Sequence, residues 1–262
     1  MVGKKRKKRR SKSTLGNHQR GWLWGRHAVL ETLRAGRWRP YELLICDELL
    51  EAALLKEILQ RCDDDQIPLG FTDANGLEDL VRARDHQGVA ARMPEFPLKD
   101  FEELVSELPE RPFLLILDRI QDPYNFGSIL RSADLFGVDG IIIGDREQAG
   151  ISSHVARSSS GAVNYLNITQ VESLPAAAQQ LQSAGIELIS ASEKAETSPA
   201  ELDLTQGAAI IIGNEGAGVA SELMEQCTTL CAIPQTGHVD SLNAAVAAGI
   251  LCYEVQRQRR SS

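Results

Sequence analysis

This chain lacks the features that membrane, secreted and metal-binding proteins carry. No apolar run in its 262 residues approaches the roughly 20 residues that a membrane span needs, and its first residues lack the apolar segment of a secretory signal. No cluster of His, Cys and Asp has the spacing of metal ligands, so we expect no metal site. The five cysteines form no CxxC pair, and their odd number argues against a disulfide framework: Cys46, Cys62, Cys227, Cys231 and Cys252. We therefore expect a cytoplasmic globular protein without a membrane anchor.

Positive charge is scarce in most of the chain and gathers at its beginning. Residues 4–10 are seven consecutive lysines and arginines, and Lys12 adds an eighth basic residue. The whole chain has a net charge of −8, so the part without these eight charges has −16. A basic tail on an acidic body is typical of an arm that binds nucleic acid in a salt-dependent way. A solubilising tail and a targeting tract are the alternatives. Residues 1–20 lack periodicity, and we expect them to be disordered.

Residues 21–93 alternate short strands and helices, which predicts a small α/β sandwich. The elements expected are helix 28–35, strand 43–46, helix 49–61 and strand 88–92. Gly36 is expected to stop the first helix. Prolines then mark a linker over residues 94–108, whose second half predicts a short acidic helix.

Residues 109–262 are expected to form a mostly parallel α/β sheet. The run FLLIL at residues 113–117 is continuously apolar, as in strands that are covered on both faces. Helices alternate with the strands, and the last helix is expected over residues 242–258. Four more strands are expected at residues 140–144, 187–191, 208–213 and 229–233.

The segment NFGSILRSA, which begins at Asn125, is the first of three motifs. Asn125 stands where the N-cap of a helix is expected, and Gly137 stands where that helix should stop. Three residues share a helix face that an RNA backbone could approach closely: Gly127, Ser128 and Arg131. The alternative is purely structural. Asn125 then only caps the helix, and Arg131 only pairs with Asp134 or Asp118.

The second motif, IIGNEGAG, brings three glycines to the end of a strand at residues 211–218. Because glycine has no Cβ, backbone groups around Gly213 could approach a ligand closely. Ligands of open α/β sheets bind outside the carboxyl ends of strands. The pattern is not a dinucleotide fingerprint, because a first-strand position and the later ribose-binding acid are missing. Taken alone, Glu215 could be only a first-turn acid that the helix dipole favours.

The third motif follows the strand end at Ile233 and opens a helix at Ser241, Leu242 and Asn243. Apolar Ile233 and Leu242 suit the walls of a site for a cofactor with an adenine ring. The structural alternative makes Ser241 only an N-cap and Asn243 only a first-turn residue. The small residues that follow, AAVAAG at 244–249, permit close packing within the fold or against a second subunit.

These three motifs, in this order, resemble the SpoU family of RNA ribose 2′-O-methyltransferases, in the SPOUT superfamily, over residues 112–257. The resemblance implies that the parallel sheet belongs to an α/β-knot with a deep trefoil knot. The segments GRHAVLETL, from Gly25, and HQGVAAR, from His86, look like the N-terminal RNA-binding domain of members that act on ribosomal RNA. The resemblance further implies a homodimer with S-adenosylmethionine as its cofactor.

The resemblance assigns roles to eight residues. Backbone groups of three residues are expected to hold S-adenosylmethionine: Gly213, Ile233 and Leu242. Five residues are expected to form the catalytic site: Asn125, Arg131, Glu215, Ser241 and Asn243. Because a guanidinium is a very weak acid, we expect Arg131 to clamp the 2′-oxygen or a phosphate electrostatically and not to act as a free base.

The expected activity is methylation of a ribose 2′-hydroxyl, in a guanosine of large-subunit (23S) ribosomal RNA. Transfer RNA is the alternative substrate. Two other classes of protein stay open. One is a catalytically inactive RNA-binding assembly factor, and the other is a nucleotide-binding oxidoreductase, which the missing strand-GxGxxG-helix unit disfavours. Binding of S-adenosylmethionine would separate the expected enzyme from both.

Overall fold

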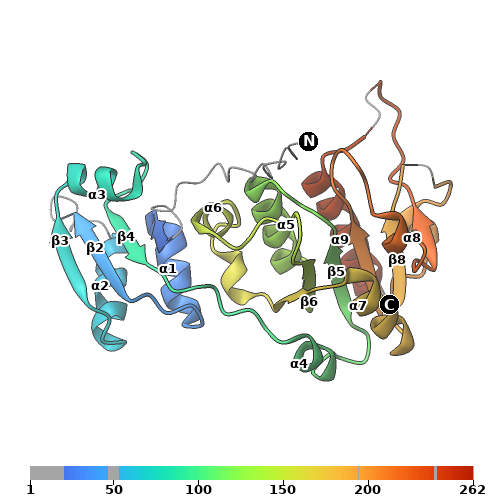
Figure 1. Cartoon of the computed structure of the whole chain (residues 1–262), viewed down its shortest axis with the longest axis horizontal. Helices are drawn as coiled ribbons and strands as arrows, with labels where there is room; N and C mark the ends of the chain where they lie inside the picture. The colour runs from blue at the N-terminus through green and yellow to red at the C-terminus, as the bar shows by residue number, and fades with distance from the viewer. Residues whose placement is uncertain (1–20, 47–52, 194, 239–240, 262) are drawn as a thin grey trace, which may run out of the picture.

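The computed structural model describes residues 21–46, 53–193, 195–238 and 241–261. Two α/β units lie along its longest axis, with α1 (Arg26–Ala35) and α6 (Ser153–Ser158) between their sheets (Figure 1). The tail for which disorder is expected lies outside the described residues, as does the beginning of the helix expected at 49–61.

A mixed sheet of four strands forms the first unit, in the order β1 (Trp22–Trp24), β4 (Val89–Arg92), β2 (Glu42–Cys46) and β3 (Leu69–Thr72). β4 pairs antiparallel with β1 and β2, whereas β2 and β3 are parallel. Because side chains alternate along a strand, one face buries Leu43 with α1 and α2 (Ala53–Asp64). The other face packs Trp24 against α3 (Ala74–Val81).

The predicted elements of this unit are confirmed, and three others were missed. α1 ends where expected, because Gly36 has a φ of 66° and its N–H donates to Thr32 O. The sequence pattern did not reveal β1, β3 and α3. β3 is an edge strand of exposed and half-buried residues, so it lacks the apolar run that marks an inner strand.

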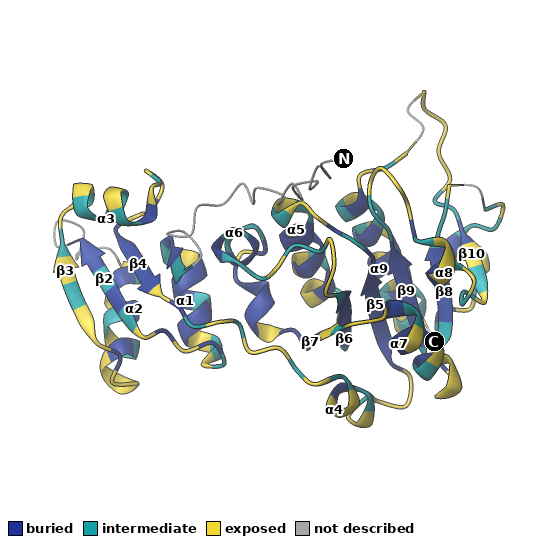
Figure 2. Ribbon diagram, in the orientation of Figure 1, coloured by how far each residue is buried: buried dark blue, intermediate teal, exposed yellow. Residues whose placement is uncertain are grey.

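A parallel sheet of six strands forms the second unit. Its order is β10 (Thr229–Cys231), β8 (Glu187–Ala191), β9 (Ala208–Ile212), β5 (Phe113–Leu117), β6 (Gly140–Gly144) and β7 (Ile168–Val171). Every neighbouring pair is parallel. The five predicted strands are confirmed, although β9 and β10 end earlier than predicted, and β7 was missed. β5 and β9 are central and fully buried (Figure 2), which explains their continuous apolar sequences.

Helices cover both faces of the parallel sheet. α5 (Pro123–Leu135) and α9 (Ala244–Ser261) share a core with Leu115, while α4 (Phe101–Ser106) and α7 (Leu174–Ser183) belong to the opposite face. Short helices also occur in the described residues at η3 (Ala162–Tyr165), η4 (Pro199–Glu201) and α8 (Ser221–Met224). The trefoil knot stays a prediction, because the path from β10 to α9 passes through residues 239–240, which are outside the described residues.

Two predicted helix starts are wrong. α5 begins at Pro123 after Asp122, whose carboxylate accepts a hydrogen bond from Tyr124 N at 2.9 Å. Asp122 is therefore the N-cap, and the fixed φ of a proline suits the first helical position. Asn125, which was expected to be the N-cap, lies inside the first turn. α9 begins at Ala244, two residues after its predicted start.

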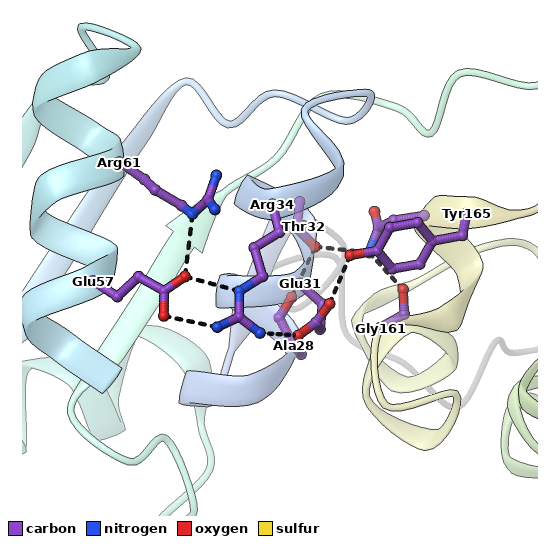
Figure 3. A network of polar contacts seen from close by, with 9 residues as sticks. Ala28, Glu31, Thr32, Arg34, Glu57, Arg61, Gly161 and Tyr165 are labelled. Carbon is purple, nitrogen blue, oxygen red and sulfur yellow. Dashed lines mark hydrogen bonds and ion pairs between the residues drawn. The ribbon is translucent and has the colours of Figure 1, made fainter. Parts of the chain in front are cut away.

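The two units are packed against each other through α1. Asn164 of η3 and Thr32 of α1 are both buried, and Asn164 Nδ2 donates to Thr32 Oγ1 at 3.1 Å. Tyr165 Oη, also of η3, donates to the Glu31 carboxylate at 2.7 Å. Figure 3 shows this polar network between α1 and η3. The N-terminal unit therefore has a defined position on the parallel-sheet unit.

Candidate active site

Three segments from distant parts of the chain meet at the carboxyl edge of the parallel sheet. They are the first turn of α5, the loop after β9 and the start of α9. Asn125 of α5 stands in the middle. Its Nδ2 donates to the Glu215 carboxylate, and its Oδ1 accepts a hydrogen bond from Asn243 Nδ2 at 3.0 Å. The structure thus brings together three of the five residues that the sequence suggested as catalytic.

The cap of α9 sets the orientation of these side chains. Asn243 Oδ1 accepts hydrogen bonds from Ala245 N at 2.9 Å and from Val246 N at 3.3 Å. With its oxygen engaged there, the amide of Asn243 can only point its Nδ2 at Asn125. Asn125 then presents its own Nδ2 to Glu215, which is a charged and therefore stronger acceptor. One helix cap thus orients the whole group.

The N-cap of α9 is Asn243 and not Ser241, which corrects the capping role expected of the serine. Ser241 is exposed and lies two residues before the cap, next to half-buried Leu242. Ile233 is also half-buried and follows β10, while Gly213 follows β9. Because the sheet is parallel, Ile233 and Gly213 both lie at its carboxyl edge. Two half-buried apolar side chains at this edge fit the walls of an adenine site.

Gly213 is needed for the loop's own backbone, and its expected backbone contact with S-adenosylmethionine stays a prediction. A Cβ at Gly213 would overlap the backbone of Gly218 and Val219. Gly218 has a φ of 67°, in the left-handed region that favours glycine. Both glycines are therefore needed for the tight turn that presents Glu215.

Three polar residues outside the expected site shape this turn. Asn214 Oδ1 accepts from Gly216 N at 2.9 Å, and its Nδ2 donates to Arg119 O at 3.0 Å. Buried Asp118 accepts from Ala220 N at 2.7 Å and pairs with the Arg119 guanidinium. A signal for Asp118 was present, since it is the first polar residue after the apolar strand β5.

Arg131 does not join the Asn125 group within one chain. It stands six residues further along α5, about 9 Å along the helix axis and on a different face. Its side chain is exposed, and its Nη1 donates to Ser160 Oγ at 3.0 Å. Within the described part of the chain it forms an ion pair with neither Asp134 nor Asp118. The structural alternative for Arg131 is therefore not what the structure shows.

The open helix face expected around Gly127 is wrong for this glycine. A Cβ at Gly127 would overlap the Ser158 side chain of α6, so the glycine lets α6 pack closely against α5. Ser128 and Arg131 are exposed and remain accessible to a ligand.

No three His, Cys, Asp or Glu side chains among the described residues are grouped as ligands of a metal ion. None of the helices that the structure describes is long and apolar enough to cross a membrane. A cavity of about 740 Å³ lies between the two units, lined by β1, residues between 93 and 98 and the loop before α6. It includes none of the eight expected site residues.

Two family models cover most of the chain. Residues 112–253 match the SpoU rRNA Methylase family, and residues 22–98 match the RNA 2′-O ribose methyltransferase substrate-binding domain. This chain belongs to the SpoU rRNA methylase family. It is an RNA 2′-O-ribose methyltransferase with an N-terminal substrate-binding unit. The domain boundaries that we expect, after residues 93 and 108, stay predictions.

Two of its relatives match more than 90% of the chain, and a third matches a shorter part. YacO of Bacillus subtilis (strain 168), assigned to the TrmH family of tRNA/rRNA methyltransferases, is 32% identical over 246 residues, which is 93% of this chain and 98% of YacO. The SpoU methyltransferase AviRb from Streptomyces viridochromogenes, solved in complex with AdoMet, is 28% identical with a TM-score of 0.78, over 92% of this chain and 91% of AviRb. The A. aeolicus TrmH/SpoU tRNA modifying enzyme is 26% identical with a TM-score of 0.53, over 62% of this chain and 83% of its own.

Proposed function

We propose that this SpoU protein uses S-adenosylmethionine to methylate a ribose 2′-hydroxyl in ribosomal RNA. The observation that carries the proposal is the hydrogen-bonded group of Asn125, Glu215 and Asn243 at the carboxyl edge of the sheet. Half-buried Ile233 and Leu242 lie in the segments that reach the same edge. The AdoMet complex of AviRb, whose fold is the same, supports this choice of cofactor.

The chemistry divides between the cofactor and the protein. S-adenosylmethionine supplies a methyl group that is already electrophilic, because it is attached to a sulfonium. The Asn125 amide and the Glu215 carboxylate are fixed against each other, so they orient the ribose as a unit. Holding the reacting atoms in line contributes up to roughly 7–11 kcal/mol. The guanidinium of Arg131 stabilises the negative charge that develops on the 2′-oxygen, whose proton passes to a phosphate or water.

The N-terminal unit favours ribosomal RNA over transfer RNA. The A. aeolicus tRNA modifying enzyme matches only 62% of this chain, whereas the substrate-binding model matches residues 22–98. A second unit packed beside the methyltransferase unit lengthens the surface that can hold a folded RNA. We take a guanosine of large-subunit (23S) ribosomal RNA, in the cytoplasm, as the target. Transfer RNA is the second candidate, because YacO is assigned to tRNA/rRNA methyltransferases.

Exposed apolar side chains on α9 and α5 support a homodimer. Val246, Ile250 and Tyr253 of α9 are 49%, 39% and 54% exposed, and Leu135 of α5 is 66% exposed. The three α9 residues recur at spacings of four and three, so they form one stripe. A second copy would cover this stripe in a two-fold arrangement. Not all the small residues of α9 can lie in the dimer interface, because Ala248 is fully buried within the fold.

A site shared by two copies accounts for the separation of Arg131 from Asn125. In a dimer, Arg131 of one protomer serves the Asn125 group of its partner. The inactive variants Arg131→Ala and Asn125→Ala, unfolded and refolded together, should then regain about one quarter of the wild-type activity. Recovery of none would contradict a shared site. Ile250→Glu should weaken the dimer in light scattering, and an active wild-type monomer at micromolar concentration would refute the dimer.

Methyl transfer to purified RNA tests the function directly. Labelled S-adenosylmethionine is supplied with 23S ribosomal RNA or with transfer RNA, and the methylated nucleotide is mapped by mass spectrometry. Arg131→Ala should slow single-turnover transfer by roughly 100-fold while calorimetric affinity for S-adenosylmethionine stays near that of the wild type. Arg131→Lys should also be slow, because lysine lacks the planar fork. Transfer to tRNA alone would select the second candidate, and transfer to neither RNA would overturn the proposal.

A further inference from the structure

The guanidinium of Arg131 is held by a turn that the three motifs do not include. Ser160, whose Oγ accepts its hydrogen bond at 3.0 Å, stands between α6 and η3. The φ of Ser160 is 54°, in the left-handed region that residues other than glycine rarely adopt. Such a conformation persists only where the surrounding structure holds it. The contacts of this turn therefore set the direction in which Arg131 points.

Helix α1 of the N-terminal unit lies directly against this turn. Gly161, the next residue after Ser160, has a φ of 88°, and a Cβ there would overlap the side chain of Glu31. On the surface, Tyr165 Oη donates to the Glu31 carboxylate at 2.7 Å. Figure 3 shows Glu31 between Tyr165 on one side and Arg34 on the other.

A buried contact fixes the same turn from inside. Asn164 Nδ2 donates to Gly161 O at 2.9 Å and to Thr32 Oγ1 at 3.1 Å. Thr32 and Asn164 are only 1% and 2% exposed. Hydrogen bonds shielded from water are stronger and cost more to break. α1 thus holds the turn through one exposed and one buried bond.

α1 in turn is tied to the rest of the N-terminal unit. Arg34 donates to Glu31 and to Glu57 of α2, both at 2.7 Å. Burial and the neighbouring Glu31 carboxylate raise the pKa of Tyr165 to about 12, so its hydroxyl remains a donor at neutral pH. A displacement of the N-terminal unit would therefore move the turn that carries Ser160.

We propose that Ser160 is a positioning residue for Arg131, and that the N-terminal substrate-binding unit sets the position of Ser160 through Glu31 and Thr32. This inference rests on the proposed function of Arg131 in methyl transfer. RNA that is correctly held by the N-terminal unit meets an arginine already oriented for the reaction. RNA that displaces this unit disorders the arginine and is methylated slowly, which adds selectivity beyond binding. Ser160 positions Arg131 in the same way whichever protomer's site Arg131 serves, because α1, Ser160 and Arg131 belong to one chain.

A double-mutant cycle in the full-length enzyme tests this coupling. Ser160→Ala removes the acceptor for Arg131 without a larger side chain and should slow single-turnover transfer about tenfold at saturating RNA and cofactor. Tyr165→Phe removes only the bond to Glu31 and should slow transfer about threefold. In the Ser160→Ala background, Tyr165→Phe should have no further effect, because Arg131 has already lost the hydrogen bond to residue 160 through which Tyr165 acts. Affinities for RNA and S-adenosylmethionine and the melting temperature should stay near wild-type values.

Tyr41→Phe is the matched control. Tyr41 is an exposed tyrosine of the N-terminal unit whose ring lies against Arg92, far from the turn in sequence, and its loss of a hydroxyl should leave the rate unchanged. A Ser160→Ala enzyme as fast as the wild type would overturn the positioning role. Equal effects of Tyr165→Phe in both backgrounds would overturn the coupling to α1. In both cases an active wild-type enzyme leaves the proposed function intact, whereas an inactive wild type removes the function itself.

Discussion

Asn243 has two tasks that two substitutions can separate. Its Oδ1 caps α9, and its Nδ2 donates to Asn125 Oδ1 at 3.0 Å. Asn243→Asp keeps an oxygen for the cap, since Asp and Asn cap helices about equally well, but it removes the donor. Asn243→Ala removes both the cap and the donor. The two variants should therefore share one defect and differ in the other.

The sizes of the two defects follow from the contacts. In Asn243→Asp, Asn125 meets an acceptor on both sides, Glu215 and the new carboxylate, and its single amide can serve only one. The lost hydrogen bond costs about 1 kcal/mol, and no burial penalty is added because the bond is exposed. About 1 kcal/mol in the transition state slows transfer roughly fivefold. In Asn243→Ala the lost cap costs about 1 kcal/mol of unfolding free energy, which lowers the melting temperature by about 2–4 °C.

Single-turnover methyl transfer and thermal melting measure the two defects separately. Both variants should be slow, and Asn243→Ala should melt about 2–4 °C earlier than Asn243→Asp, because only the alanine variant also loses the cap. A wild-type rate in Asn243→Asp would show that Asn243 serves only α9, and the orienting role of the cap would be refuted. An equal drop in the melting temperature of both variants would refute the cap itself.

Three further predictions concern the glycine turn, the basic tail and the titration of His154. Gly213→Ala should lower the melting temperature by about 5 °C, because its Cβ would overlap the backbone of Gly218. Gly216→Ala is the control, because its Cβ would have an ordinary contact at 3.5 Å. Equal melting temperatures of the two variants would contradict this reason. Deleting residues 1–12 removes eight positive charges and should weaken RNA binding and flatten its salt dependence, whereas an unchanged salt slope would show that the tail does not touch RNA. Burial lowers the pKa of His154 from its ordinary value of 6.5, so the unfolded chain takes up this proton more readily and stability should fall as the pH drops below about 6.5. His154→Gln should show a smaller fall of the melting temperature between about pH 7 and pH 5, and parallel curves would contradict the assignment.

The parallel sheet could be predicted because its inner strands are buried on both faces. Residues 113–117 and 208–212 are apolar throughout, as in strands that are covered on both faces. The edge strand β3 leaves no such pattern because none of its residues is buried, and β1 is only three residues long. Helix starts shifted for a local reason: Asp122 and Pro123 together form a stronger start than Asn125.

The candidate site could be predicted as a set of segments but not as a set of contacts. Asn125, Glu215 and Asn243 were expected at one site, yet their mutual hydrogen bonds depend on the crossing of α5, the β9 loop and α9. The hydrogen bond between Arg131 and Ser160 could not be predicted either, because 29 residues separate the two along the chain. Periodicity and spacing describe neighbours in sequence, and they carry no information on such tertiary pairs.

The small residues of α9 explain how two distant amides come within hydrogen-bonding distance. Ala248 is fully buried in the core that α9 shares with α5, and a Cβ on Gly249 would lie only 3.3 Å from Ser132 Oγ of α5. Larger side chains would therefore push the two helices apart. The beginnings of these helices carry Asn125 and Asn243, whose contact of 3.0 Å depends on the helix spacing. The small residues of α9 are therefore needed for packing within one chain, whether or not a second subunit binds. The distance between Asn125 and Asn243 depends on this packing of α9 against α5.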